Sequence, residues 1–245
     1  MKKEVRNGVV KGDFNVTNDM LNKGRLTIKL QEVTGDFYCA FTKITSLKGS
    51  PGKVGGDFWC YHTKITDLKG APREVGGDFL CSRTNITDLK GAPEKVGTGQ
   101  KGGDFDCSHT KIKSLQGAPR EVNGDFSCSF TKITDLKGSP EAVGGDFDCE
   151  KNPSLKSLVG SPRKINGYFN CSNTSITDLV GSPEEVGTCP KDGFPDFFDC
   201  SDTSITDLEG CPREVNGDFF IRNVGRQFTE EEVREVCDVK GKVFV

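Results

Sequence analysis

The chain is built from a repeat of about 21 residues. Aligning it on the motif Gly-Asp-Phe marks ten phenylalanines, and most neighbouring pairs are 21 residues apart: Phe14, Phe37, Phe58, Phe79, Phe105, Phe126, Phe147, Phe169, Phe198 and Phe219. A unit this short cannot bury a core alone, so its copies must stack on one another. With 33% hydrophobic residues and 30 glycines, the chain suits a stacked array better than one round core.

The unit from Val54 to Glu74 shows how one coil is expected to form. Phe58 and Cys60 are separated by one outward residue, which is the alternation of a strand. Ile65 and Leu68 then point inward without helical spacing, and 70–72 (Gly-Ala-Pro) turns the chain back. The repeat predicts a mainly β solenoid of about nine to ten coils, with short parallel strands on a concave face.

The same spacing resembles that of leucine-rich repeats, L-x-L-x-x-N-x-L-x-x-L, over nearly the whole chain. Phenylalanine and cysteine stand at the strand leucines, and Thr63 stands where the family has asparagine, which Asn152 restores in the one irregular coil. Repeats of the type GDFxCSxTxITDLxGAP are also similar to those of leucine-rich-repeat-like proteins encoded by tailed bacteriophages. That resemblance implies a phage source, without implying a mechanism.

Irregular segments divide the chain into three parts. Residues 1–32 are expected to form an N-terminal cap and first coil, 33–221 the solenoid, and 222–245 a C-terminal cap. Longer steps before Phe105 and Phe198 predict inserted loops near 97–101 and 187–196. In the last part, 229–232 (Thr-Glu-Glu-Glu) fits a capping box, which predicts a small helix to about Cys237, followed by a strand over 242–245.

Charge and hydropathy argue against two classes of partner. The 33 basic and 36 acidic residues nearly cancel, so no basic footprint for nucleic acid or an anionic membrane is expected. No apolar run approaches the roughly 20 residues of a membrane helix, and the opening MKKEVRNGVVKGDF lacks the apolar stretch of a signal peptide. The expected location is the cytoplasm, or the host cytoplasm if the chain is phage-encoded.

Two repeated columns could be mistaken for metal sites. Eight of the eleven cysteines follow the repeat phenylalanine by two residues: Cys39, Cys60, Cys81, Cys107, Cys128, Cys149, Cys171 and Cys200. We expect them to be a buried, reduced ladder, because parallel side chains in one column do not converge on a metal. The aspartates before the phenylalanines are expected to bond to turn backbone or to lysine, because one column gives calcium too few ligands.

The sequence offers little for catalysis. Its two histidines, His62 and His109, fall in one column two coils apart, about 10 Å. No glycine loop followed by lysine is present to hold a phosphate. We therefore expect no enzyme activity, no cofactor and no metal.

The outward positions between phenylalanine and cysteine vary from coil to coil, so the fold does not dictate them. They are Tyr38, Trp59, Leu80, Asp106, Ser127, Asp148, Asn170, Asp199 and Phe220. Just beyond the cysteines, the early coils add Phe41, Tyr61, His62 and Arg83. Such residues dominate protein-binding hot spots, so Tyr38, Phe41, Trp59, Tyr61, His62, Leu80 and Arg83 are predicted to bind a partner.

Two alternatives stay open at this point. A flanking segment, 20–30, could cover the aromatic residues, and the acidic stretch 106–202 could either steer a basic partner or simply be solvated. The leading hypothesis is a non-catalytic phage factor that modulates or inhibits a host protein through its concave face. The others are a virion or assembly component, and a protein that sequesters a small molecule or nucleotide. The sequence fixes neither the partner nor the oligomeric state.

Overall fold

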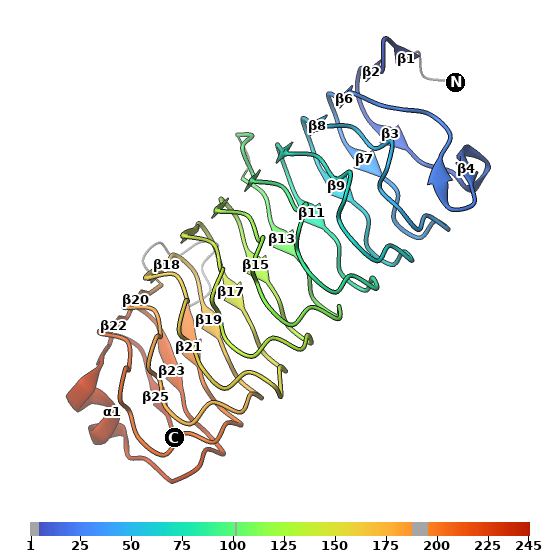
Figure 1. The fold of residues 1–245 in the computed structure, drawn as a ribbon. Coiled ribbons are helices and arrows are strands. Elements are labelled where there is room, and N and C mark those ends of the chain that lie inside the picture. Colours follow the sequence, from blue (N-terminus) through green and yellow to red (C-terminus); the bar gives the residue numbers. More distant parts are fainter. Residues whose placement is uncertain (1–4, 101, 188–195) are drawn as a thin grey trace.

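A computed structural model describes residues 5–100, 102–187 and 196–245. The chain is a β-solenoid of about eleven turns, with its two ends at opposite ends of the stack (Figure 1). Each regular turn contributes one short strand to each of two parallel sheets, which we call sheet A and sheet B.

Sheet A contains the strands that end each repeat, and sheet B contains the phenylalanine strands. The parallel strands of sheet A are β2 (Val9–Val10), β6 (Glu32–Val33), β8 (Lys53–Val54), β10 (Glu74–Val75), β12 (Lys95–Val96), β14 (Glu121–Val122), β16 (Ala142–Val143), β18 (Lys164–Ile165), β20 (Glu185–Val186), β22 (Glu214–Val215) and β24 (Asp238–Val239); β1 (Val5–Arg6) pairs antiparallel with β2 at the edge. The strands of sheet B are β3 (Phe14–Asn15), β7 (Phe37–Tyr38), β9 (Phe58–Trp59), β11 (Phe79–Leu80), β13 (Phe105–Asp106), β15 (Phe126–Ser127), β17 (Phe147–Asp148), β19 (Phe169–Asn170), β21 (Phe197–Asp199), β23 (Asp218–Phe220) and β25 (Val243–Phe244).

The structure differs from the sequence prediction in two respects. Sheet A was not expected, and the count of about nine to ten coils was too low. Strands of sheet A have a single inward valine or isoleucine beside glycine or asparagine, so they show no alternation to read. The extra turn comes from the tail, where Val243 and Phe244 pair with Phe219 and Phe220 of β23 although they lack the Gly-Asp-Phe motif.

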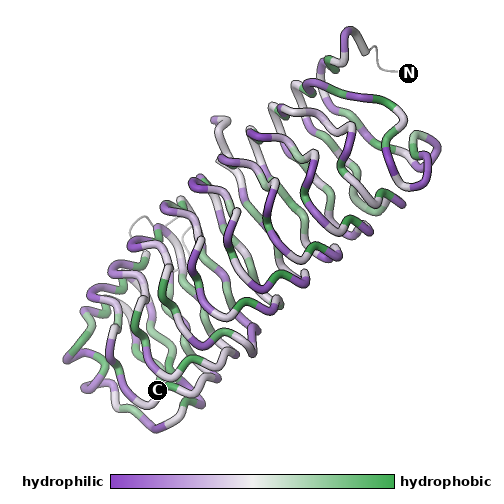
Figure 2. The backbone as a smooth tube through the Cα atoms, in the orientation of Figure 1, coloured by the Kyte–Doolittle hydropathy of each residue, from purple (hydrophilic) through white to green (hydrophobic). Residues whose placement is uncertain are grey.

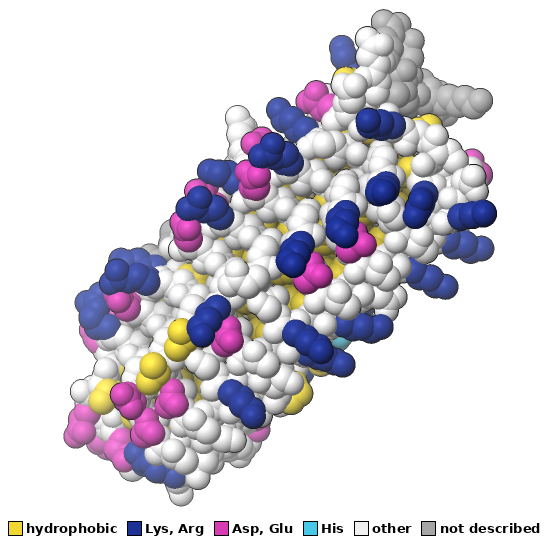
Figure 3. All heavy atoms as spheres, viewed as in Figure 1, with side chains coloured by type: hydrophobic (Ala, Val, Ile, Leu, Met, Phe, Trp, Pro, Cys, Tyr) yellow, Lys and Arg dark blue, Asp and Glu magenta, His cyan; other side chains and the backbone are white. Residues whose placement is uncertain are grey.

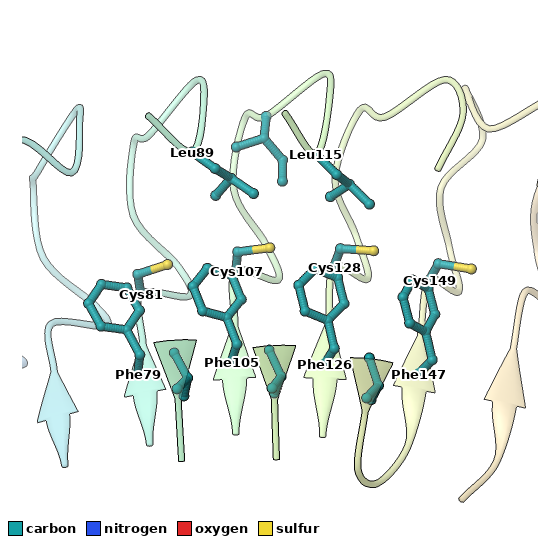
Figure 4. Packing of buried hydrophobic residues seen from close by; sticks show 14 of the residues in the cluster. Phe79, Cys81, Leu89, Phe105, Cys107, Leu115, Phe126, Cys128, Phe147 and Cys149 are labelled. Carbon is teal, nitrogen blue, oxygen red and sulfur yellow. The ribbon is translucent and has the colours of Figure 1, made fainter. Parts of the chain in front are cut away.

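Sheet B owes its core to the predicted inward alternation. The repeat phenylalanines are buried, and consecutive rings stack with centroids 5.0–5.9 Å apart. The eight column cysteines are buried free thiols, as predicted, and form a second ladder beside the rings (Figure 4). Around each coil, hydrophobic and hydrophilic segments therefore alternate (Figure 2).

A threonine turns the chain after each regular strand of sheet B. The Thr63 hydroxyl is buried and donates to the Cys60 carbonyl at 2.7 Å, which satisfies a carbonyl that has left the sheet. Farther along the coil, Gly70 has a φ of +96°, and a Cβ there would lie 2.6 Å from the Leu47 carbonyl oxygen of the previous coil. Only glycine fits this approach.

The column of aspartates links each coil to the next. Oδ1 of Asp36 accepts from the backbone N–H of Asp57 at 2.9 Å, and Oδ1 of Asp57 accepts from that of Asp78 at 2.9 Å. The bond recurs along the stack through Asp125 and Asp146. These carboxylates bond to turn backbone, as predicted for them.

The two ends of the stack differ from the middle. Near the N-terminus, a short 3-10 helix, η1 (Asn18–Met20), leads into a hairpin of β4 (Leu21–Asn22) and β5 (Arg25–Leu26). Near the C-terminus, α1 (Glu230–Val236) begins with the predicted capping box, in which Thr229 and Glu232 bond to each other's backbone. Within the described ranges, no helix has both the length and the apolar character needed to cross a membrane.

The inserted loops are described only in part. In the first, the N–H of Thr98 and that of Gly99 donate to the carbonyls of Val75 and Gly76, so these residues lie back on the preceding coil. Most of the second, 188–195, lies outside the described residues.

Candidate functional site

Three of the predicted site residues lie side by side on the outer face of sheet B. Tyr38, Trp59 and Leu80 are the outward residues of β7, β9 and β11, and the parallel register places Tyr38 opposite Trp59 and Trp59 opposite Leu80. All three are half-buried. The strand pairing therefore turns a repeat position into a contiguous row.

Aromatic contacts join this row to the turn that follows it. The Tyr38 and Trp59 rings meet edge to face with centroids 4.9 Å apart, and Trp59 lies 6.0 Å from Tyr61. Tyr61 in turn meets Phe41 at 5.2 Å. Phe41 also stacks on His62 at 4.9 Å. We call the seven predicted residues the aromatic patch: Tyr38, Phe41, Trp59, Tyr61, His62, Leu80 and Arg83.

The turn residues of the patch are the ones most open to solvent. Phe41, His62 and Arg83 have φ values of 57°, 51° and 52°, in the left-handed region that few non-glycine residues adopt. Phe41 is 69% exposed, the largest exposed fraction among the large hydrophobic side chains that the structure describes. A phenyl ring this exposed gains little from folding and is available to a partner.

Polar groups within the patch are held differently. The Tyr38 hydroxyl donates to Oδ2 of Asp36 at 2.6 Å, and this hydrogen bond, with burial and nearby aspartates, raises the pKa of Tyr38 well above its usual range. Nε1 of Trp59 is buried and has no hydrogen-bond partner among the described residues. The ring of Tyr38 is thus anchored, while the indole of Trp59 is held by ring packing.

Segment 20–30, considered above as a cover for the patch, makes its hydrogen bonds elsewhere. The Gly24 carbonyl accepts from the N–H of Thr45, and the N–H of Leu30 donates to the Gly49 carbonyl. The segment therefore continues the stack beside residues 45–49, beyond the turn that holds Phe41. Phe41 remains largely exposed with this segment in place.

A second aromatic cluster, at the C-terminal end of sheet B, was not predicted. Tyr168 and Phe197 stack at 4.5 Å, and Phe220 and Phe244 stack at 4.6 Å. The Arg222 guanidinium lies 4.8 Å from the Phe244 ring centroid. The available signal was that Tyr168 and Phe197 replace the repeat aspartate directly before the buried phenylalanine.

An acidic hollow separates the two aromatic regions on the outer face of sheet B. Leu80, Asp106, Asp148 and Tyr168 are among the residues that line it. Burial raises the pKa of Asp148 to about 6, against an ordinary value of 3.8. In the part of the chain that the structure describes, no group of three or more His, Cys, Asp or Glu residues is arranged to hold a metal ion.

The sequence of this chain matches no protein-family model and no curated protein. Its fold and the geometry of its surface therefore carry the functional argument.

Proposed function

We propose that this protein is a non-catalytic binding protein that engages a protein partner through the aromatic patch. The observation that carries the proposal is the continuous set of ring contacts from Tyr38 through Trp59 and Tyr61 to the exposed Phe41. The fold uses phenylalanine and cysteine for its core and does not require aromatic residues at these outward positions. Large aromatic side chains at such positions supply the binding energy of many protein interfaces.

The resemblance to leucine-rich-repeat-like proteins of tailed bacteriophages supplies a more specific form of the proposal. In that form the chain is a phage-encoded factor that acts in the host cytoplasm by modulating or inhibiting a host protein. The solenoid would present the outer face of sheet B as a rigid surface, because each strand is fixed by its neighbours on both sides.

The test is truncation of Trp59 to alanine. The indole nitrogen has no partner among the described residues, so the change breaks no hydrogen bond within them, and loss of the ring contacts costs about 1 kcal/mol of stability. At a binding hot spot the same change costs at least about 2 kcal/mol, a loss near thirtyfold in affinity. We expect Trp59→Ala to lose the partner while remaining folded.

Phe220→Ala is the matched control, because Phe220 occupies the same outward column at the other end of sheet B. A partner captured by the parent protein should bind Phe220→Ala normally and Trp59→Ala at least about thirtyfold more weakly, as measured by titration calorimetry. Equal binding by Trp59→Ala and the parent would exclude the aromatic patch. Loss in Phe220→Ala alone would transfer the site to the second cluster.

A further inference from the structure

One column of turn residues continues the edge of the aromatic patch across six consecutive coils. We call it the turn ladder: Phe41, His62, Arg83, His109, Phe130 and Lys151. All six have φ values between 51° and 57°. Consecutive rungs are tied by backbone hydrogen bonds at this turn, such as that from the N–H of His109 to the Ser129 carbonyl at 3.0 Å.

The backbone does not select these side chains. Asparagine and aspartate are the non-glycine residues that best tolerate a left-handed conformation. The last three coils follow that preference, with Asn173, Asp202 and Asn223 at the same turn. The six coils of the ladder depart from it in favour of rings and cations, at a cost in backbone energy that the fold does not require.

Neighbouring rings of the ladder stack on each other in pairs, while Phe41 and Phe130 remain 69% and 40% exposed. Phe41 and His62 are 4.9 Å apart and nearly parallel, and His109 and Phe130 are 4.2 Å apart at 13°. Nζ of Lys151 lies 4.9 Å from the centroid of Phe130. The ring faces thus meet along the stack, and the ring edges, which carry partial positive charge, point outward.

Exposed lysines accompany the ladder two residues farther along the chain: Lys43, Lys64, Lys111 and Lys132. Among the described residues, Lys151 pairs with Glu150 at 3.0 Å, and no ion pair forms at Arg83 or at these four lysines. Figure 3 shows this edge, where the coils turn after sheet B, as a row of Lys and Arg side chains with a His among them.

The edge beside sheet A provides a contrast. There, cations of one coil pair with carboxylates of the next: Arg73 with Glu94, Arg120 with Glu141, and Arg163 with Glu184, at 2.6–2.8 Å. The same stack therefore pairs its cations with carboxylates coil by coil on one edge, whereas on the ladder edge only Lys151, among Arg83, Lys151 and the four accompanying lysines, has an ion-pair partner in the described residues. The unneutralised edge is suited to an anionic partner.

We propose that the turn ladder binds an acidic α-helix of the partner protein, lying along the solenoid axis. Coils are spaced by about 5 Å, as the buried rings of Phe37 and Phe58 show at 5.0 Å. An α-helix advances about 5.4 Å per turn, so one carboxylate per turn meets each rung. Six rungs span about 25 Å, the length of a helix of about 17 residues. This inference rests on the proposed function only in taking the partner to be a protein.

Two other anionic partners fit less well. In an extended peptide, side chains on one face are about 6.6 Å apart, which falls out of step with the rungs. Single-stranded nucleic acid is bound by stacking its bases on exposed ring faces, and here one face of each of the four rings is already taken up by its stacked partner.

The test uses a defined probe. It is a fluorescein-labelled, alanine-based helical peptide of 18 residues with one glutamate per turn on one face; its twin has glutamine at those positions. In low-salt buffer, we expect fluorescence anisotropy to show that the parent protein binds the glutamate peptide at least about tenfold more tightly than the twin.

The variant Arg83→Asn/Lys151→Asn removes two cations of the turn ladder. Asparagine already occupies the same left-handed turn at Asn173 and Asn223. It should bind the glutamate peptide about tenfold more weakly than the parent. Lys90→Asn/Lys137→Asn removes the same charge from exposed lysines that follow Leu89 and Leu136, away from the ladder, and should bind within about twofold of the parent.

Three results would overturn the inference: equal binding of the two peptides, equal binding by the two double variants, or tighter binding of an 18-nucleotide oligothymidylate than of the glutamate peptide. The two proposals have separate readouts: Trp59→Ala is scored on the captured partner, and the two double variants are scored on the glutamate peptide. If Trp59→Ala loses the captured partner while the glutamate peptide binds no better than its twin, the proposed function stands and the ladder inference fails.

Discussion

Asn152 gives the sharpest test of how the coils are held together. It replaces the turn threonine in the coil of β17 and is completely buried. Its Oδ1 accepts from the N–H and the hydroxyl of Thr131 at 2.7 and 2.8 Å. Its Nδ2 donates to the carbonyls of Cys149 and Cys128 at 2.9 and 3.0 Å, so this one amide bridges two coils.

The cost of Asn152→Ala follows from which groups lose their partners. Thr131 keeps its hydroxyl bond to the Cys128 carbonyl, so those two groups remain paired. The N–H of Thr131 and the carbonyl of Cys149 lose the partner that Asn152 provides. At roughly 1–3 kcal/mol for each of these two buried groups left without a partner, the free energy of unfolding should fall by about 2–6 kcal/mol.

Thr174→Ala is the natural comparison, because Thr174 occupies the same turn in the next coil and makes one such bond, to the Cys171 carbonyl at 2.8 Å. It should cost about 1–2 kcal/mol. Urea denaturation followed by circular dichroism measures both variants. A loss for Asn152→Ala no larger than that for Thr174→Ala would refute the bridging role of the amide.

Two further predictions concern buried groups of the solenoid. Burial raises the pKa of Asp148 to about 6. Between about pH 4 and pH 6 the folded protein therefore holds a proton that the unfolded chain has lost. The free energy of unfolding falls as the pH rises through that window. Asp148→Asn should therefore be more stable than the parent by about 1–3 kcal/mol at pH 7.5 and show no such advantage at pH 4; a difference in unfolding free energy that is constant with pH would contradict this. The column cysteines are buried, and burial raises their pKa values, so a thiol reagent at pH 8 should label Cys128 and its neighbours only after urea unfolds the protein; rapid labelling of the native protein would show that the ladder is open.

Much of the coil could be predicted from the sequence because the inward positions repeat. Phe58 and Cys60 are separated by one outward residue, and Thr229 with Glu232 forms a local capping box; both are patterns of nearby residues. Sheet A was not predicted, because its strands are two residues long, with one residue turned outward and one buried. A strand this short shows no period of hydrophobic residues. The strand over 242–245 was predicted, but it was not counted as a further coil, because Val243 and Phe244 join sheet B by pairing with β23 and lack the repeat motif.

The aromatic patch could be located because parallel pairing in register converts a repeat column into a row in space. Tyr38, Trp59 and Leu80 became neighbours for that reason alone. The column of the turn ladder could be found in the same way, since His62 and His109 fall four residues after their repeat phenylalanines, but its backbone conformation could not. Its character depends on a left-handed backbone at Arg83 and His109, and neither residue type signals that conformation in a sequence.

The aspartate column also bears on how such a protein can change length. From Asp36 to Tyr168 each carboxylate accepts from the amide one coil ahead, as Asp104 does from Asp125 at 2.8 Å, so the joints along this run are chemically the same. Duplicating or deleting one whole 21-residue unit within this run would leave its joints intact, whereas a change of any other size must be absorbed as a loop, as in the longer step before Phe105. The number of coils can thus rise or fall by recombination in steps of one coil. Each step would add or remove one rung of the binding edge.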